Sequence, residues 1–310
     1  MIKKDEAKMA GIPFDQREGK IILDGAIVEW KDAKIHVLTH ALHYASCVFE
    51  GERSYNGVIF KSHEHSLRLE KSAKILGLTL PMSAEEITKT KAELLKLNNI
   101  VDGYVRVFAW RGSEQMGVSA QATKTHMAFC CWEWPSYFSE EKREKGLSLI
   151  TAQYRRPAPD TAPTQAKAAG LYMICTISKH AAEAAGHDDA MMLDYRGYVA
   201  EATGANIFFI KGNEIHTPTP DCFLNGLTRQ TAIALAKDKG YTLIERHIMP
   251  DEIGGFDECF LTGSAAEIAA VGSIDQHKYT VGPVVRDIRS AYEDLVRGVE
   301  PAAQSAAKGG

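Results

Sequence analysis

Long apolar runs and paired cysteines are both lacking, and their absence excludes several classes of protein. No stretch approaches the about 18 apolar residues that a membrane-spanning helix needs. The charged segment 1–20 contains no apolar stretch, so we expect neither a signal peptide nor a membrane anchor. The scattered cysteines form no C-x-x-C pair, which argues against a disulfide framework or a zinc site and favours reduced thiols in a cytoplasm. They are Cys47, Cys130, Cys131, Cys175, Cys222 and Cys259.

An excess of charge of one sign is also lacking. Lys and Arg total 36 against 40 for Asp and Glu, so the formal net charge is −4. This balance gives no reason to expect binding to nucleic acid or to an anionic membrane. The 310 residues are 45% hydrophobic and 25% charged, which is typical of a globular protein of one large or two modest domains.

The first half contains signals for hairpins, helices and buried strands. Asp24-Gly25 and Asn56-Gly57 each separate two apolar runs, which predicts type I′ hairpin turns. The helical spacing in SHEHSLRLEKSAKILG predicts a helix that ends near Gly77. Ser83 and Glu86 form the pattern of a capping box for a second helix, which runs to about residue 98. The segments YVRVFAW and THMAFCCWEW are typical of buried strands.

The second half predicts further strands, hairpins and two helices. One helix is expected from about Tyr172 to Ala185, with Gly186 ending it. Another begins in LTRQTAIALAKDKG, with Thr228 as a plausible N-cap and Gly240 at its end. Strands are expected in LSLITAQY, YTLIERHI and ECFLTG, and hairpins in AMMLDYRGYVAEA and NIFFIKGNEIHTP.

This order of elements predicts an α+β protein of two domains. We place a small N-terminal domain at 1–135 and a larger C-terminal domain at 148–310. The polar segment 136–147 is expected to link them. The small, polar tail PAAQSAAKGG is expected to be frayed.

Histidines cluster near the N-terminus, at His36, His40, His43, His63 and His65. A His-x3-His spacing on a helix can bind a metal, but no carboxylate or cysteine has a matching spacing within HVLTHALHY. We therefore favour histidines that are hydrogen-bonded locally. A non-catalytic metal-binding protein built on this cluster is retained as an alternative from another functional class.

Lys167 lies among small residues in PTQAKAAGLY. Most lysines are solvated at the surface. A desolvated lysine, in contrast, has a lowered pKa and becomes a nucleophile that can form a Schiff base. Both interpretations of Lys167 are open from its composition alone.

Three features could bind an anion. LNGLTR joins a Gly-containing turn to a helix start, whose backbone N–H groups can bind phosphate or can belong to an ordinary capped helix. LTGSAAE is a second small-residue turn, and Arg68 could bind phosphate bidentately or lie on the surface of an amphipathic helix.

Glu201 stands among small and apolar residues in GYVAEATGANIF. A carboxylate buried in such a strand needs a cationic partner or becomes protonated. The ring nitrogen of a cofactor could be that partner. Alternatively, the side chain faces solvent on the polar side of the strand.

Taken together, the motifs carry a resemblance to a known family. The chain resembles the fold type IV, class IV pyridoxal-phosphate (PLP) aminotransferases, and among them the branched-chain amino acid aminotransferases. The resemblance runs from about residue 23 to about residue 287, and its motifs occur in family order and at family spacing. They are HALHYASCVFEG, HEHSLRL, YVRVF followed by QMGV, PTQAKAAGLY, GYVAEATGANIF, LNGLTR and LTGSAAE.

The resemblance implies a small α/β sandwich, a larger pseudo-barrel domain and a PLP cofactor in the cleft between them. Lys167 matches the catalytic lysine that carries the cofactor, and Glu201 matches the acid that pairs with the pyridine nitrogen. Tyr172 matches the phenol near the ring hydroxyl. The matches to the phosphate-binding positions are Arg68, Leu227, Thr228 and Ser264.

The resemblance also implies a substrate pocket for branched-chain L-amino acids and for glutamate. Tyr104 matches a binder of the substrate α-carboxylate, together with the backbone of Ser264 and Ala265. Arg106 and Tyr44 match the groups that receive the distal carboxylate of glutamate. The remaining pocket matches are Phe49 and Val118, of which Val118, like Tyr44, reaches in from the neighbouring subunit in the family.

Four positions depart from the family pattern. Glu52 replaces a usually apolar residue in EG-x-R, close in sequence to pocket residues, so this departure bears on the expected substrate preference more than on the expected reaction type. The other departures are Leu171 in place of Asn, Ala205 in place of Glu and Asn225 in place of Pro.

The sequence therefore predicts a cytoplasmic PLP-dependent transamination between Leu, Ile or Val and 2-oxoglutarate, with no resident metal. A homodimer is expected, or a hexamer built from such dimers. The nearest alternative is another class IV activity: D-amino acid or (R)-amine transamination, or aminodeoxychorismate lyase.

Overall fold

The computed structural model describes residues 12–134 and 139–299. The N-terminal residues 1–11, part of the predicted linker and the predicted frayed tail lie outside this range. The chain forms two compact units: the first contains 1–136 and 157–176, and the second 137–156 and 177–310. The segment that carries Lys167 thus belongs to the first unit, while the domain boundaries given above remain a prediction.

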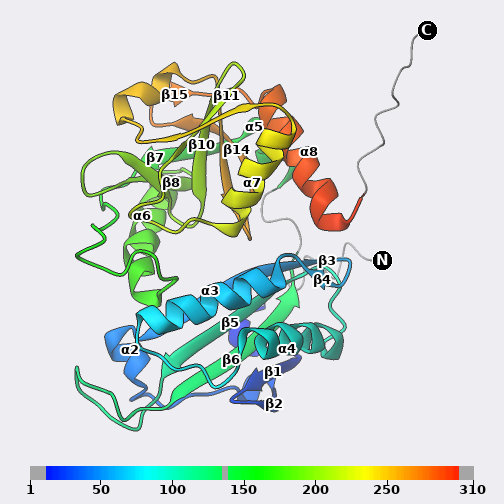
Figure 1. Ribbon diagram of the computed structural model, residues 1–310, viewed down its shortest axis with the longest axis vertical. Helices are drawn as coiled ribbons and strands as arrows, with labels where there is room; N and C mark the ends of the chain where they lie inside the picture. The colour runs from blue at the N-terminus through cyan, green and yellow to red at the C-terminus, as the bar shows by residue number, and fades with distance from the viewer. Residues whose placement is uncertain (1–11, 135–138, 300–310) are drawn as a thin grey trace. The chain divides into compact units, whose positions relative to one another are not determined.

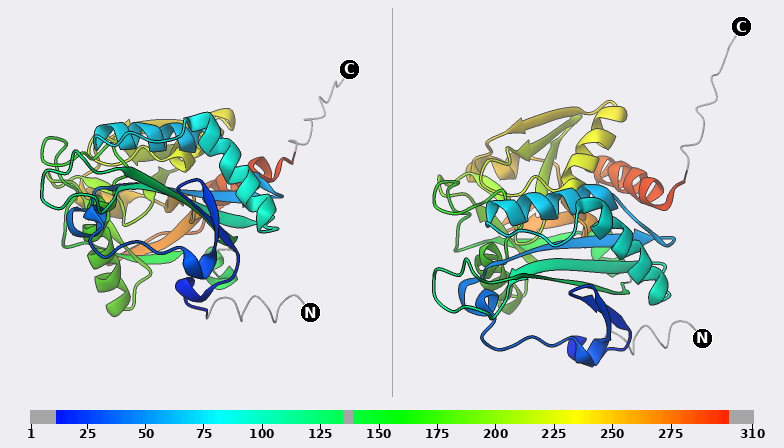
Figure 2. Two further views of the ribbon diagram at one scale, coloured as in Figure 1. Left: turned by 90° about the horizontal axis from the view of Figure 1, so that it is seen from below. Right: turned by 60° about the horizontal axis from the view of Figure 1, so that its bottom comes forward.

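The first unit is an antiparallel sheet of six strands in the order β2-β1-β6-β5-β3-β4. Two helices, α3 and α4, lie side by side against one face of this sheet (Figures 1 and 2). The strands are β1 (Lys20–Leu23), β2 (Ala26–Glu29), β3 (Cys47–Tyr55), β4 (Val58–Ile59), β5 (Gly103–Arg111) and β6 (Thr125–Glu133). The helices are α2 (His40–Tyr44), α3 (Ser62–Ile75) and α4 (Ala84–Leu97), with short 3₁₀ turns η1 (Phe14–Gln16), η2 (Trp30–Asp32) and η3 (Ala169–Tyr172).

The turns and caps of this unit agree with the sequence. Asp24 and Gly25 have φ angles of 50° and 81°, and the second hairpin turn has the same left-handed pair, which confirms the type I′ turns. Gly77 follows the end of α3 with φ of 66°. Both hydrogen bonds of the capping box between Ser83 and Glu86 are present at the start of α4.

The alternation of side chains along β3 separates two chemical environments. Val48 faces α3 and α4 and belongs to the apolar core, together with Val105, Val107 and Leu69. Glu50 and Glu52 share that buried face because they are two and four residues further along the strand. Phe49 and its alternate neighbours face the opposite side of the sheet. The register with β5 adds Tyr104 and Arg106 to that side.

The second unit is a nine-stranded sheet that closes on itself. The strand order is β12-β11-β10-β13-β14-β7-β8-β9, and the pairing of β9 with β10 closes six strands into a barrel. The strands are β7 (Leu147–Thr151), β8 (Asp189–Leu193), β9 (Val199–Ala202), β10 (Asn206–Lys211), β11 (Glu214–Pro218), β12 (Thr242–Arg246), β13 (Glu258–Gly263), β14 (Glu267–Ile274) and β15 (His277–Lys278). The helices are α5 (Glu140–Lys145), α7 (Leu227–Asp238), α8 (Pro283–Arg297), the turn η4 (Pro250–Gly255), and α6 (Met173–Ala184), whose first residues group with the first unit.

In the second half one N-cap needs correction, and further elements were not predicted. Gly226, and not Thr228, is the N-cap of α7, because the helix begins at Leu227, two residues earlier than the side-chain pattern indicates. The predicted polar link contains the short helix α5. Strand β14 and helix α8 were not predicted. β14 is rich in small residues and pairs with both β13 and β7, so its partners define it more than its propensity does.

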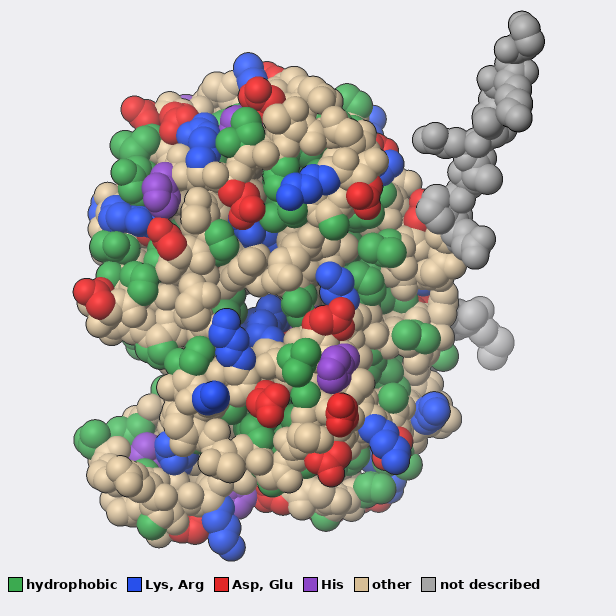
Figure 3. Space-filling view, in the orientation of Figure 1, with side chains coloured by type: hydrophobic (Ala, Val, Ile, Leu, Met, Phe, Trp, Pro, Cys, Tyr) green, Lys and Arg blue, Asp and Glu red, His purple; other side chains and the backbone are tan. Residues whose placement is uncertain are grey.

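The surface agrees with the balanced charge of the sequence. On the face that Figure 3 shows, basic and acidic side chains are interspersed over each unit. Within residues 12–134 and 139–299, no helix is long and apolar enough to cross a membrane.

Candidate functional site

The backbone of Lys167 is held in an extended segment beside the edge of β3. Its carbonyl accepts a hydrogen bond from the N–H of Phe49 at 3.1 Å, and its own N–H donates to Oγ of Ser72 on α3 at 3.0 Å. The flanking residues Ala166 and Ala168 are buried, 1% and 4% exposed. Small residues are needed there because the segment packs closely against the strand and the helix. The backbone is thus fixed while the side chain of Lys167 projects away.

The amine of Lys167 is half-buried between two aromatic rings. Its Nζ donates a hydrogen bond to the hydroxyl of Tyr172 at 2.7 Å and lies 4.9 Å from the ring centre of Phe49. Burial, and after it the positive charge of Arg68, lower the pKa of Lys167 to about 8, while Glu50 partly opposes both effects. The residue therefore has the desolvated, nucleophilic character that composition alone left open.

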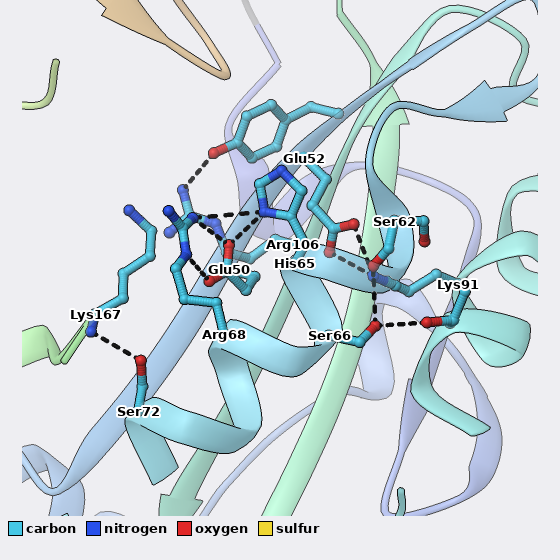
Figure 4. A network of polar contacts seen from close by, with 12 residues as sticks. Glu50, Glu52, Ser62, His65, Ser66, Arg68, Ser72, Lys91, Arg106 and Lys167 are labelled. Carbon is cyan, nitrogen blue, oxygen red and sulfur yellow. Dashed lines mark hydrogen bonds and ion pairs between the residues drawn. The ribbon is translucent and has the colours of Figure 1, made fainter. Parts of the chain in front are cut away.

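Arg68 lies on α3 and binds a buried carboxylate. Its Nε and Nη2 each lie 2.7 Å from one oxygen of Glu50. His65, one helical turn earlier, places its Nδ1 2.7 Å from the same carboxylate, which is 1% exposed (Figure 4). The Nε and Nη2 edge of the Arg68 guanidinium is thus hydrogen-bonded to Glu50, so a second anion would have to bind at the other edge.

Tyr104 and Arg106 project from β5 on the side of the sheet that Phe49 occupies. The Nη2 of Arg106 donates to the Tyr104 hydroxyl at 3.3 Å, and its guanidinium lies 4.7 Å from the ring centre of Phe49. A Cβ on Gly51 would lie only 1.8 Å from that hydroxyl, so the position of Tyr104 requires glycine there. This face therefore combines an apolar ring, a phenol and a guanidinium.

Two further residues of this face were not identified from the sequence. Arg53 is 5% exposed, and within the described residues its Nε and Nη1 have no hydrogen-bond partner. Buried guanidinium donors without a partner are suited to binding an anion. Trp134 packs against Tyr104 with ring centres 5.4 Å apart. Arg53 could have been found, since an arginine in the otherwise buried strand CVFEGERSY needs an anionic partner.

Tyr44 and Val118 lie apart from this group in the first unit. Tyr44 at the end of α2 is 44% exposed, and Val118 in the loop between β5 and β6 is 87% exposed. His40 joins the two segments, because its Nε2 lies 2.8 Å from the carbonyl of Gly117. They belong to one exposed surface, formed by α2 and the loop between β5 and β6.

Glu201 lies on β9 of the second unit and is surrounded by donors. Its side chain is 12% exposed and Oε1 lies 3.3 Å from Nε of the buried Arg156. The amide of Asn206 donates to the other carboxylate oxygen at 3.2 Å. The outward-facing alternative is therefore wrong, and the carboxylate has the cationic neighbour that its burial requires.

Two backbone turns of this unit offer N–H groups. The first turn of α7 follows Gly226 and contains Leu227 and Thr228. In the part of the chain that the structure describes, no side chain caps this turn. Uncapped N–H groups at a helix start are suited to a phosphate. Ser264 and Ala265 lie in the short turn between the paired ends of β13 and β14. The amine of lowered pKa in the first unit fits an aldehyde. The N–H donors and the buried carboxylate of the second unit fit a phosphate and a basic ring nitrogen.

The histidine cluster uses its ring nitrogens in local hydrogen bonds. Those of His40 lie 2.7 Å from Oγ of Ser46 and 2.8 Å from the carbonyl of Gly117. His65 contacts Glu50, as described above. His36 accepts from the N–H of Leu38, and His43 contacts the carbonyl of Val37. His63 is exposed on α3. These contacts give no support to the metal-binding alternative.

Among the described residues, the group with a metal-ligand arrangement contains no histidine. It consists of Asp194, Asp221 and Cys222. The guanidinium of Arg196 contacts both carboxylates, at 2.6 Å and 2.8 Å, and so already supplies a cation there.

The four departures from the family pattern have structural roles. Glu52 is fully buried and forms an ion pair with Lys91 of α4 at 2.7 Å, on the face opposite Tyr104 and Arg106. It therefore does not line that face, and its effect on substrate preference stays a prediction. Leu171 and Ala205 belong to apolar clusters, and Asn225 accepts a hydrogen bond from Arg229.

Comparisons with known proteins agree with this geometry. The family described as "Amino-transferase class IV" matches residues 47–274. The probable branched-chain-amino-acid aminotransferase of Rickettsia felis is 43% identical over 268 residues, which are 86% of this chain and 91% of the relative. The branched-chain-amino-acid aminotransferase of Pseudomonas aeruginosa is 40% identical over 91% of this chain and 94% of its own.

Solved structures show the same relationship. The branched-chain amino acid aminotransferase of Escherichia coli superposes with a TM-score of 0.89 at 33% identity, over 93% of this chain and 98% of its own. The Thermobaculum terrenum enzyme in its PLP form gives 0.84 at 27% identity, over 91% and 95%. The chain therefore belongs to the class IV aminotransferases, which use pyridoxal phosphate. Its fold is that of the fold type IV enzymes, and the resemblance to the branched-chain aminotransferases is confirmed.

Proposed function

We propose that this chain transfers the amino group between branched-chain L-amino acids and 2-oxoglutarate, with PLP bound at Lys167. The observation that carries the proposal is the half-buried amine of Lys167, 2.7 Å from the Tyr172 hydroxyl and beside the ion pair of Arg68 with Glu50. When bound, PLP supplies an electron sink that stabilises negative charge on the substrate Cα.

Lys167 then moves the substrate proton. A pKa of about 8 leaves part of the amine neutral near neutral pH, so the amine can accept the proton from the substrate Cα and return it elsewhere. Tyr172 fixes the position of Nζ. Glu201, whose negative charge Arg156 stabilises, is suited to hold a proton on the ring nitrogen of the cofactor.

The phosphate ligands are proposed from the residues that match the phosphate-binding positions of the family. The first turn of α7, at Leu227 and Thr228, offers N–H groups at the positive end of the helix dipole. Ser264 adds a donor in the turn after β13, and Arg68 adds a positive charge from α3.

The substrate groups are proposed to bind on the Tyr104 side of β3. Tyr104 binds the α-carboxylate, together with the backbone of Ser264 and Ala265. Arg106 receives the distal carboxylate of glutamate, and Phe49 contacts the aliphatic side chain of leucine, isoleucine or valine. A guanidinium beside an apolar ring serves both substrates, since the ring keeps an apolar surface for the first and the charge attracts the second.

A second copy of the chain is proposed to cover the surface formed by α2 and the loop after β5. Tyr44 and Val118 are exposed there, and Leu42 is 63% exposed beside them. In a homodimer, or a hexamer of such dimers, these residues would complete the pocket of the neighbouring copy. Sedimentation of the purified protein tests this assembly. We also propose a cytoplasmic location, which the six unpaired cysteines support.

The function is tested by chemical trapping and a substrate panel. The purified protein is reduced with borohydride, and peptide mapping is expected to find the cofactor on Lys167. The holoenzyme is then assayed with 2-oxoglutarate and L-leucine, D-alanine or an (R)-amine. We expect turnover of L-leucine. Cofactor on another lysine contradicts the proposed site, and preference for D-alanine or the (R)-amine assigns a different class IV activity.

A further inference from the structure

We propose that Glu50 is a positioning residue for Arg68. By fixing one edge of the guanidinium, Glu50 directs the other edge to the phosphate, and it also sets the charge next to Lys167. This inference depends on the proposed function, because it assumes a phosphorylated cofactor at this site.

The contacts of Glu50 determine the orientation of Arg68. Oε1 accepts from Nε of Arg68, and Oε2 accepts from Nη2, both at 2.7 Å. This bidentate pairing restricts rotation of the guanidinium. His65 holds the carboxylate from a second direction at 2.7 Å, so Glu50 itself is fixed (Figure 4). Nη1 belongs to the edge that Glu50 does not use and is the group placed to meet an anion.

The charge of Glu50 is maintained despite its burial. Burial by itself raises the pKa of Glu50, but Arg68 and His65 outweigh it and hold the pKa well below its usual range. The carboxylate therefore offsets the positive charge of Arg68. Lys167 is affected by both groups, since Arg68 lowers the pKa of its amine and Glu50 raises it. Removing the charge of Glu50 would therefore lower the pKa of Lys167.

Glu52 is a closely matched control within the same strand. It lies two residues from Glu50 on the same buried face of β3 and is fully buried. Its carboxylate binds Nζ of Lys91, at 2.9 Å and 2.7 Å, and not Arg68. Lys91 also donates to the carbonyl of Ser62 at 2.8 Å. Figure 4 shows the two carboxylates with these separate partners. A Glu52 variant therefore removes an equally buried carboxylate without removing a hydrogen-bond partner of Arg68.

The experiment compares Glu50→Gln with Glu52→Gln as holoenzymes. PLP affinity is measured by equilibrium dialysis, and affinity for pyridoxal, which has no phosphate, is measured in the same way. We expect Glu50→Gln to weaken PLP binding at least about tenfold, as for a lost charge-assisted contact, but pyridoxal binding less than about threefold. Glu52→Gln should change either affinity less than about threefold.

A second readout follows the charge next to Lys167. The pH midpoint of the visible absorption of the bound cofactor is expected to fall in Glu50→Gln and to stay unchanged in Glu52→Gln. A merely structural role of Glu50 would not move this midpoint selectively. Glu50→Asp keeps the charge but shortens the side chain, so it should retain the midpoint more closely than Glu50→Gln while still weakening PLP binding.

Several results would overturn the inference. An equal loss of PLP affinity in Glu50→Gln and Glu52→Gln would show a general effect of removing a buried carboxylate. Equal loss of PLP and pyridoxal would show that the phosphate is not involved. If Glu50→Gln does not fold, Glu50→Asp decides, and unchanged PLP affinity in that variant contradicts the positioning role. Failure of the wild-type protein to bind PLP at Lys167 would instead reject the proposed function itself.

Discussion

Asn206 joins Glu201 to the start of α7. Its Nδ2 lies 3.2 Å from Oε2 of Glu201, and its Oδ1 accepts a hydrogen bond from the N–H of Gly226 at 3.2 Å. The same amide donates to the carbonyl of Leu224 at 2.9 Å, and the residue is 5% exposed. One side chain thus fixes the buried carboxylate and the turn that precedes the helix start proposed to bind phosphate.

Substitution of Asn206 should therefore weaken cofactor binding in a graded way. Asn206→Ala removes the buried hydrogen bonds, and we expect a loss of PLP affinity of about tenfold. Asn206→Asp should cost more, because it places a second negative charge beside Glu201. Equilibrium dialysis of both holoenzymes measures the effect. If the Asn206→Asp variant binds PLP more tightly than the Asn206→Ala variant, this role of the amide is contradicted.

Arg106→Leu should separate the two substrates. Loss of a charged hydrogen-bond donor should raise the KM for 2-oxoglutarate about 10- to 100-fold. The KM for the branched 2-oxo acids should change less, because they present only an aliphatic group beside Phe49. Steady-state kinetics with each acceptor measure the ratio. An equal rise in KM for 2-oxoglutarate and for the branched 2-oxo acids would contradict the proposal that Arg106 binds the distal carboxylate.

The reactivity of Lys167 should depend on pH in a particular range. Only the neutral amine reacts, so the rate of condensation of the cofactor-free protein with pyridoxal should rise up to about pH 8 and then level. A solvated lysine would continue to gain reactivity towards its ordinary pKa of 10.5. Arg68→Met should move the midpoint upward, since the positive charge that lowers the pKa is lost. A wild-type midpoint near 10.5 would show a solvated amine.

His126 should make stability depend on pH. Its Nδ1 lies 2.6 Å from Asp24 and its Nε2 3.0 Å from Glu114, so both contacts are hydrogen bonds only when the ring is protonated. Burial lowers the pKa of His126, but the two carboxylates outweigh it and raise the pKa above 6.5. The stabilisation is therefore complete below about pH 6.5 and is lost as the pH rises through the raised value.

Thermal unfolding of the wild type and of His126→Gln tests this dependence. The advantage of the wild type in melting temperature should be largest at pH 5.5 to 6 and should shrink at higher pH, since the neutral ring donates only one hydrogen bond. An advantage that grows with pH would contradict the assignment.

Gly51→Ala should displace Tyr104. The added Cβ would lie 1.8 Å from the phenol oxygen, so the ring must move from the position proposed to bind the substrate carboxylate. We expect a rise in KM for the amino acid of about tenfold or more, together with about 1–3 kcal/mol lower stability from overpacking. Gly255→Ala is the control, because nothing lies within 4 Å of its added Cβ. Unchanged KM in Gly51→Ala would remove Tyr104 from the proposed carboxylate site.

Turns and helix caps could be predicted from the sequence where they depend only on residues that are close together in the chain. The Asp24-Gly25 turn and the capping box of Ser83 and Glu86 follow from backbone φ angles and side-chain reach over three residues, and both are present. The N-cap of α7 was misplaced at Thr228 because Gly226, which has no side chain to signal a cap, occupies the position.

The motifs alone determined the family, the expected cofactor and the lysine proposed to bind it, because each motif combines residue types that a particular chemistry needs. Only the tertiary structure decided that Glu50 holds Arg68 while Glu52 holds Lys91. Both glutamates occupy the same face of one strand, and their partners come from different helices. A buried charge requires a partner, but the packing of α3 and α4 against β3 determines which partner it finds.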